Sequence, residues 1–102
     1  MTKTQLESKF QADLIVRLRE LFPGCIIQKL DEQYQTGIPD LLILWGDRWA
    51  TLECKRSLTE PYRPGQEWFI DVMNQMSFSS MICPENKEEV LHALQYALRV
   101  RR

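Results

Sequence analysis

The chain of 102 residues is long enough for one domain with a modest core, and its 44% hydrophobic and 26% charged residues are typical of a globular protein. Its net charge of −1 excludes binding to nucleic acid through bulk positive charge alone. The sequence has no apolar run of about 18 residues and no signal-peptide pattern. We therefore expect a single cytoplasmic domain over residues 1–102 that does not act at a membrane.

The first predicted element is a helix over residues 5–22. Apolar residues recur in it at spacings of three and four, at Leu6, Phe10, Leu14, Leu18 and Leu21. Thr4 is the expected N-cap, and Pro23-Gly24 ends the helix. Glu7 lies on or beside the apolar stripe and has two interpretations. It completes a Thr4-x-x-Glu7 capping box, or its carboxylate binds a metal ion or a water.

The next elements are strands. Residues 25–30 form a first strand, residues 31–37 a polar loop, and residues 41–45 a second strand. A turn at residues 46–48 leads to a returning strand over residues 49–55. Because alternate strand residues share a face, Glu53 and Lys55 point the same way, and the hairpin brings Asp40 beside them. The pattern predicts a metal site with a cationic helper.

The alternative for these three residues is an ordinary hairpin with a turn-initiating Asp40 and a surface pair of Glu53 and Lys55. Acidic residues are unfavourable in strands. Their convergence with a lysine at one end of a sheet therefore favours a functional interpretation.

The cysteines do not suggest a metal site. Cys25, Cys54 and Cys83 are far apart and form no Cys-x-x-Cys pair, so neither a zinc cluster nor a disulfide framework is expected. Each lies in an apolar, strand-like run, which predicts reduced cysteines in the core.

Residues 56–64 contain Pro61 and Pro64 and are predicted to form a loop. In this loop Tyr62 lies between Arg56 and Arg63, and aromatic and basic side chains together suit nucleic acid. A basic tail at Arg99, Arg101 and Arg102 offers further phosphate contacts. Solvated surface charge is the competing interpretation for each of these residues.

The remaining elements are a helix over residues 65–76, a short strand over residues 78–83, and a last helix that begins at the Asn86-x-x-Glu89 pattern. Gln66 lies on the inward edge of the first of these helices. It could bind a phosphate or a water beside a metal, or be an ordinary first-turn residue. The order of elements predicts a mixed α/β sandwich around a central sheet.

The residue types at the hairpin end suit phosphodiester chemistry. Asp40, Glu53 and the backbone carbonyl of Cys54 are the oxygen ligands that Mg²⁺ prefers. The ammonium of Lys55 can orient or help to deprotonate a water and can neutralise charge on a phosphate. Glu7 could hold a second metal ion or a water, as in two-metal sites.

These residues match a known signature. Pro39-Asp40, twelve intervening residues and Glu53-x-Lys55 resemble the PD-(D/E)xK nuclease superfamily, and Glu7 corresponds to the helix-borne acid of many members. The stretch from Gly37 to Leu42, together with Glu53-Cys54-Lys55 and Gln66, is most similar to the compact VRR-Nuc group. The Leu6-Glu7-x-Lys9 start also resembles junction-resolving endonucleases of the phage endonuclease I type.

The resemblance implies a restriction-endonuclease-like core, with a central mixed four-stranded sheet flanked by helices in the order αβββαβα. It implies that Asp40 and Glu53 bind Mg²⁺ or Mn²⁺, that Lys55 assists the nucleophile, and that Glu7 and Gln66 complete the catalytic site. With it we expect DNA contacts from Lys9, Arg56, Tyr62 and Arg63.

The same resemblance suggests a homodimer that cuts branched DNA, such as a Holliday junction, in the cytoplasm of a bacterial or phage-infected cell. Two alternatives stay open. One is a homing, restriction or end-processing repair nuclease with the same chemistry, and the other is a non-catalytic DNA-binding or inhibitor module.

Overall fold

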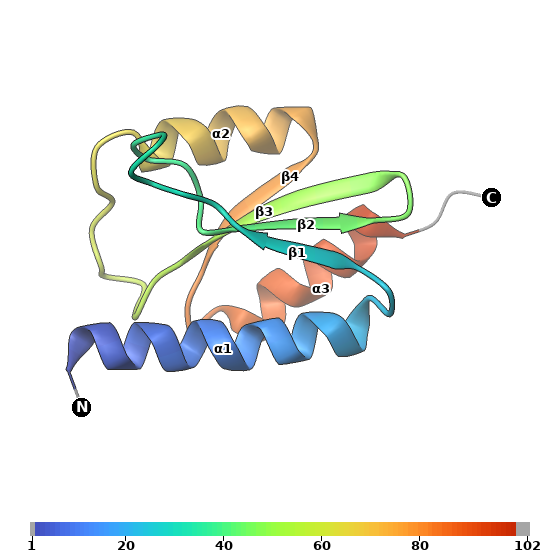
Figure 1. Cartoon of the computed structure of the whole chain (residues 1–102), viewed down its shortest axis with the longest axis horizontal. Coiled ribbons are helices and arrows are strands. Elements are labelled where there is room, and N and C mark those ends of the chain that lie inside the picture. Colours follow the sequence, from blue (N-terminus) through green and yellow to red (C-terminus); the bar gives the residue numbers. More distant parts are fainter. Residues whose placement is uncertain (1, 100–102) are drawn as a thin grey trace.

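The computed structural model describes residues 2–99 and has the predicted α/β architecture (Figure 1). Its elements are α1 (Lys3–Leu21), β1 (Ile26–Lys29), β2 (Leu41–Trp45), β3 (Arg48–Cys54), α2 (Gln66–Met76), β4 (Phe78–Ile82) and α3 (Lys87–Leu98). The class and the order αβββαβα are therefore confirmed.

The four strands form one mixed sheet in the order β1-β2-β3-β4. The pairs β1–β2 and β2–β3 are antiparallel, whereas β4 runs parallel to β3. The turn between β2 and β3 is one residue shorter than expected, because Arg48 already pairs with Trp45. Gly46 accommodates this tight turn with φ of +62°.

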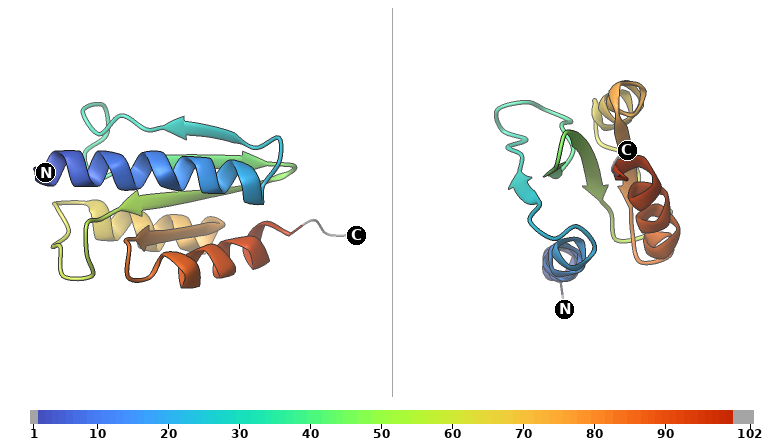
Figure 2. Two further views of the ribbon diagram at one scale, coloured as in Figure 1. Left: turned by 90° about the horizontal axis from the view of Figure 1, so that it is seen from below. Right: turned by 90° about the vertical axis from the view of Figure 1, so that its right-hand side faces the viewer.

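The two faces of the sheet are covered differently. Helices α1 and α3 lie on one face and α2 lies on the other (Figure 2). The apolar core fills the space under α1 and α3 and includes Leu14, Leu18, Phe22, Leu41, Ile43, Ala50, Leu52, Cys54, Ile82, Leu91, Leu94 and Leu98. The buried polar residues Thr51, Glu53 and Ser79 alternate with these core positions along β3 and β4, so they point to the α2 face.

The prediction of Thr4 as N-cap is wrong, and of the two interpretations of Glu7 the capping box with Thr4 is not formed. Helix α1 begins earlier, with Thr2 as its N-cap, and the capping box is formed by the side chains of Thr2 and Gln5. Thr2-x-x-Gln5 satisfies the same spacing rule one half-turn earlier, so the Glu7 carboxylate is not used for capping.

The last helix also begins without the expected capping box. Asn86 occupies the N-cap position of α3, but its side chain accepts a hydrogen bond from the amide of Cys83 and donates one to the carbonyl of Met81. The side chain therefore closes the turn after β4 instead of capping the helix.

The expectation for the cysteines is confirmed, since Cys25, Cys54 and Cys83 are all buried and free. Within residues 2–99, no helix combines the length and the apolar character needed to cross a membrane.

Candidate active site

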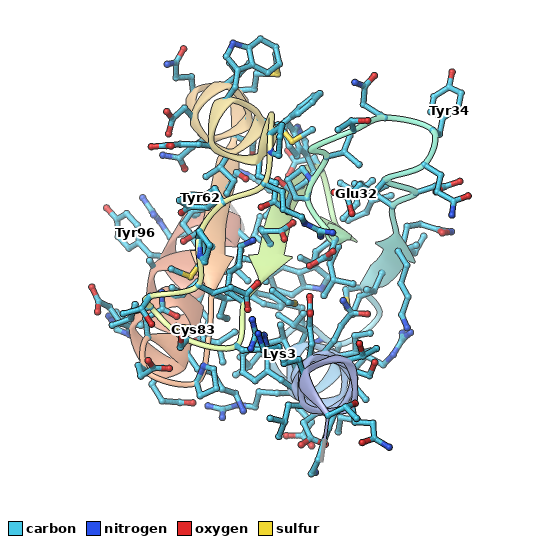
Figure 3. The ribbon with its side chains drawn as sticks, turned by 90° about the vertical axis from the view of Figure 1, so that its left-hand side faces the viewer. Lys3, Glu32, Tyr34, Tyr62, Cys83 and Tyr96 are labelled. Atoms are coloured by element: carbon cyan, nitrogen blue, oxygen red, sulfur yellow. The ribbon has the colours of Figure 1, made fainter. Side chains whose placement is uncertain are left out.

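The candidate site lies at the end of the sheet where β2 begins and β3 ends, the end that faces the viewer in Figure 3. Asp40 directly precedes β2, and Lys55 directly follows β3. The register pairs Leu41 with Leu52, so Asp40 and Glu53 adjoin each other one step further along. Asp40 Oδ2 accepts a hydrogen bond of 2.8 Å from the amide of Cys54, which fixes the carboxylate against the end of β3.

Glu53, Lys55 and Gln66 form a buried polar cluster under the start of α2, and each is about 1% exposed. Gln66 bridges the other two: its Oε1 accepts from Lys55 Nζ at 2.6 Å, and its Nε2 donates to Glu53 Oε2 at 2.9 Å. The direct ion pair between Lys55 Nζ and Glu53 Oε2 is longer, at 3.8 Å. The structure thus brings together the carboxylate, the lysine and the amide that the sequence singled out.

The segment of residues 56–65, here called the strap, closes over Lys55. Lys55 Nζ donates to the carbonyl of Pro61 at 3.3 Å and lies 3.6 Å from Glu60 Oε2, and it sits 5.5 Å from the centre of the Tyr62 ring. Glu60 is also held by Arg56, through an ion pair of 2.9 Å to the guanidinium and a hydrogen bond to the Arg56 amide. The lysine is therefore enclosed on the α2 side.

Glu60 is a partner of Lys55 that the sequence interpretation missed. A buried ammonium needs several acceptors to offset its desolvation, and Gln66 and Pro61 leave room for a carboxylate partner. Burial acts to raise the pKa of the Glu60 carboxyl, but the Arg56 amide and the charges of Lys55 and Arg56 outweigh it and the pKa is lowered. The only signal in the sequence was an acidic residue within a Pro-rich loop.

The Glu53 carboxyl has a strongly raised pKa. Burial, and after it the nearby charge of Asp40, raises the pKa of the Glu53 carboxyl to about 8. Glu53 Oε1 is buried and has no hydrogen-bond partner among the described residues. The pKa of Asp40 is also raised, mainly by burial, with the hydrogen bond from Cys54 acting in the opposite direction.

Glu7 approaches the same place from α1. Burial raises the pKa of its carboxyl, and the charges of Glu60 and Asp40 raise it further. The side chain also lines a surface cleft together with Arg63. With its capping role excluded, Glu7 is a third acid that faces the end of the sheet.

The basic residues that were predicted to contact DNA have different neighbours in the structure. Arg63 lies at the site and forms an ion pair of 3.0 Å with Glu32, from the loop before β2. Figure 3 shows Glu32 and Tyr62 on opposite sides of this end of the molecule. Lys9 forms an ion pair of 3.0 Å with Asp13 on the exposed surface of α1. Arg99 lies over the ring of Tyr96, whereas Arg101 and Arg102 lie outside the described residues.

Asp40 and Glu53 fit a hard divalent cation. Within residues 2–99, no three His, Cys, Asp or Glu side chains are grouped so as to hold a metal ion. Mg²⁺, however, is commonly bound by one or two carboxylates with water and substrate oxygens completing its shell. Asp40 and Glu53 supply those two carboxylates. Glu53 Oε1, which has no partner within residues 2–99, is the kind of atom that a cation satisfies, and the predicted third ligand, the Cys54 carbonyl, lies between Glu53 and Lys55 in the chain.

No family model, curated protein or solved structure matches this chain.

Proposed function

We propose that the chain is a Mg²⁺- or Mn²⁺-dependent DNA endonuclease of the PD-(D/E)xK type, which hydrolyses phosphodiester bonds. The observation that carries the proposal is the buried cluster at the sheet end, where Glu53 adjoins Asp40 and Lys55 and one Glu53 oxygen has no partner within residues 2–99. A buried carboxylate surrounded by other acids is costly. A bound cation and a phosphate would offset that cost.

In this proposal Asp40 and Glu53 hold the metal ion, which lowers the pKa of a water and polarises a phosphoryl oxygen. Lys55 supplies a positive charge that stabilises the charge developing on the phosphate and orients the water. Gln66 keeps Lys55 and Glu53 in fixed positions through its two short hydrogen bonds. Glu7 faces the same space and is placed to orient a water or to hold a second ion.

The enclosure of Lys55 has a consequence for substrate binding. The ammonium is about 1% exposed and already has Glu60 and the Pro61 carbonyl as partners. A substrate phosphate that contacts Lys55 has to replace one of these strap contacts. Glu60 is the group that a phosphate would replace, because both are anionic oxygen acceptors.

For the substrate we propose branched DNA, cut by a homodimer that pairs two sites across a junction in the cytoplasm of a bacterial or phage-infected cell. The small chain offers little surface for gripping a duplex alone, which supports a dimer. Its mass in solution, measured by light scattering, tests the dimer independently of any activity.

The deciding experiment is a cleavage assay on a four-way junction, a linear duplex and a flap, with Mg²⁺ or Mn²⁺. We expect Asp40→Asn and Lys55→Ala to lose about 10²–10³-fold or more of the cleavage rate, because each removes one charge from the site. Asp47→Asn, at the exposed hairpin turn, is the matched control. Full activity of Asp40→Asn would overturn the proposal.

The same panel separates the candidate functions. Paired, symmetric nicks in the junction alone identify a resolvase, whereas cleavage of the linear duplex or the flap identifies a restriction-like or end-processing enzyme. Absence of cleavage with both ions, together with no heat of divalent-ion binding, identifies a non-catalytic module.

A further inference from the structure

A surface cleft of about 270 Å³ lies between α1 and the strap, beside the cluster around Lys55. It is lined by Thr4, Glu7, Ser8, Gln11 and Arg63. The four α1 residues follow one another at spacings of three, one and three, so they occupy one face of the helix. Arg63 forms the opposite wall.

The cleft opens onto the candidate site. Glu7, at its inner border, is close enough to Asp40 and Glu60 for their charges to raise its pKa. Gln11 lies beside the thiol of Cys54, the residue between Glu53 and Lys55. A molecule in the cleft therefore lies near Asp40, one of the two carboxylates that we assign to the metal ion.

The chemistry of the lining points to anionic oxygen. Besides the carboxyl of Glu7, the lining offers two hydroxyls, the Gln11 amide and one guanidinium as donors. The Gln11 amide also contacts the Cys54 thiol, whereas within residues 2–99 the hydroxyls of Thr4 and Ser8 form no hydrogen bond. The Arg63 side chain is 58% exposed, and its ion pair with Glu32 is one that a phosphate can replace. A guanidinium binds a phosphate through two parallel hydrogen bonds.

The lining of the cleft does not suit the stacking of a nucleic-acid base. It contains no aromatic side chain on which a base could stack. Contacts from short hydroxyls and a guanidinium are those that proteins make to the sugar–phosphate backbone, which carries no sequence information. The volume suits one nucleotide unit.

We propose that the cleft binds the sugar–phosphate of the nucleotide adjacent to the scissile phosphate, with Arg63 on its phosphate and Thr4, Ser8 and Gln11 on its oxygens. This subsite rests on the proposed nuclease function and deepens it. Contacts confined to the backbone give a site that accepts any sequence, so the selectivity of the enzyme comes from the shape of the DNA.

The probe is deoxythymidine 3′,5′-bisphosphate in the presence of Ca²⁺, followed through backbone amide signals in NMR spectra. We expect the largest shifts at Thr4, Ser8, Gln11 and Arg63. Arg63→Gln should raise the Kd at least tenfold. It should also reduce the slope of log Kd against log salt concentration by the amount that about one phosphate contact contributes. The double variant Thr4→Val, Ser8→Ala should raise the Kd about three- to tenfold. Arg19→Gln, on the exposed last turn of α1, should leave it unchanged.

Two results would overturn the subsite: shifts centred elsewhere on the protein, or an unchanged Kd in Arg63→Gln with the fold intact. Cleavage assays separate this inference from the proposed function. An active enzyme whose kcat/KM is untouched by the cleft variants contradicts the subsite alone. A protein that binds the bisphosphate in the cleft but cleaves no DNA supports the subsite and contradicts the nuclease.

Discussion

At the scale of single residues, Gln66 is buried and its side chain has three hydrogen-bond partners to satisfy at once. Its side chain is about 1% exposed and serves an ammonium, a carboxylate and the backbone amide of Arg63. A side-chain amide offers an acceptor to Lys55 and a donor to Glu53 without adding charge. We interpret Gln66 as a positioning residue that holds the two charged groups in the arrangement that the proposed chemistry needs.

Gln66→Met tests this role by removing the amide while nearly preserving volume. The buried Lys55 and Glu53 and the part-buried amide of Arg63 then each lose a hydrogen bond, and we expect the free energy of unfolding to fall by about 3 kcal/mol. Gln75→Met on the exposed surface of α2 should change it by less than about 0.5 kcal/mol. Urea denaturation of both variants measures the difference, and equal stabilities would contradict the bridging role.

The site residues differ in how far the sequence could predict them. Strand alternation and the hairpin were enough to place Asp40, Glu53 and Lys55 together, because both are local rules. Glu60 and Gln11 were missed because their positions depend on how the strap and α1 pack against the sheet. Glu7 had two interpretations, and the choice depended on Thr2, a residue with no part in the site.

At the scale of elements, two loops cross at the site with their backbones in contact. Gly37 precedes β2 and Gly65 precedes α2, and a Cβ atom on Gly37 would lie 2.6 Å from the carbonyl carbon of Gly65. Both residues have positive φ, which other residues adopt only at a cost. The crossing fixes the start of α2, and with it Gln66, relative to Asp40.

Gly37→Ala tests the crossing, with Gly24→Ala as its control. Both glycines have φ above +80°, but a Cβ at Gly24 meets nothing within 4 Å. We expect Gly24→Ala to cost about 1–2 kcal/mol from backbone strain and Gly37→Ala to cost about 1–3 kcal/mol more from the clash. Urea denaturation measures both costs. If the two variants are equally stable, the close crossing is not a constraint on the fold.

Element types were predictable because helix and strand periodicities are long patterns, but element ends were not. Ends depend on single hydrogen bonds, and these went to unexpected partners in two cases. Thr2 replaced Thr4 at the start of α1, and Asn86 bonded back to the turn after β4 instead of capping α3. An end can move by two residues without any change in the apolar pattern that defines the helix.

At the scale of the whole molecule, the two faces of the sheet bury different kinds of side chain. The face under α1 and α3 carries the contiguous apolar core, whereas the face under α2 buries Glu53, Lys55 and Gln66. Burying charge opposes folding, and apolar burial on the other face offsets it. A molecule built in this way should be most sensitive to conditions that change the charge of the polar face.

Because the pKa of Glu53 is raised, we expect the stability of the folded protein to depend on pH. The Glu53 carboxyl has a pKa of about 8 in the folded protein, against the ordinary 4.5 expected when unfolded. Between these values the folded state holds a proton that the unfolded state has released, so stability falls as pH rises. The raised pKa values of Asp40 and Glu7 act with the same sign.

Urea denaturation of the metal-free protein between pH 5 and pH 8 measures the effect. We expect the free energy of unfolding to fall by up to about 1.4 kcal/mol per pH unit, with Glu53→Gln largely removing the slope and Mg²⁺ restoring stability at pH 8. Glu20→Gln, on the exposed surface of α1, is the control and should keep the wild-type slope. An undiminished slope in Glu53→Gln would show that the buried carboxyl does not hold its proton. Recovery of stability with Mg²⁺ in the wild type but not in Glu53→Gln would show that proton and metal ion compete for the same oxygen atoms.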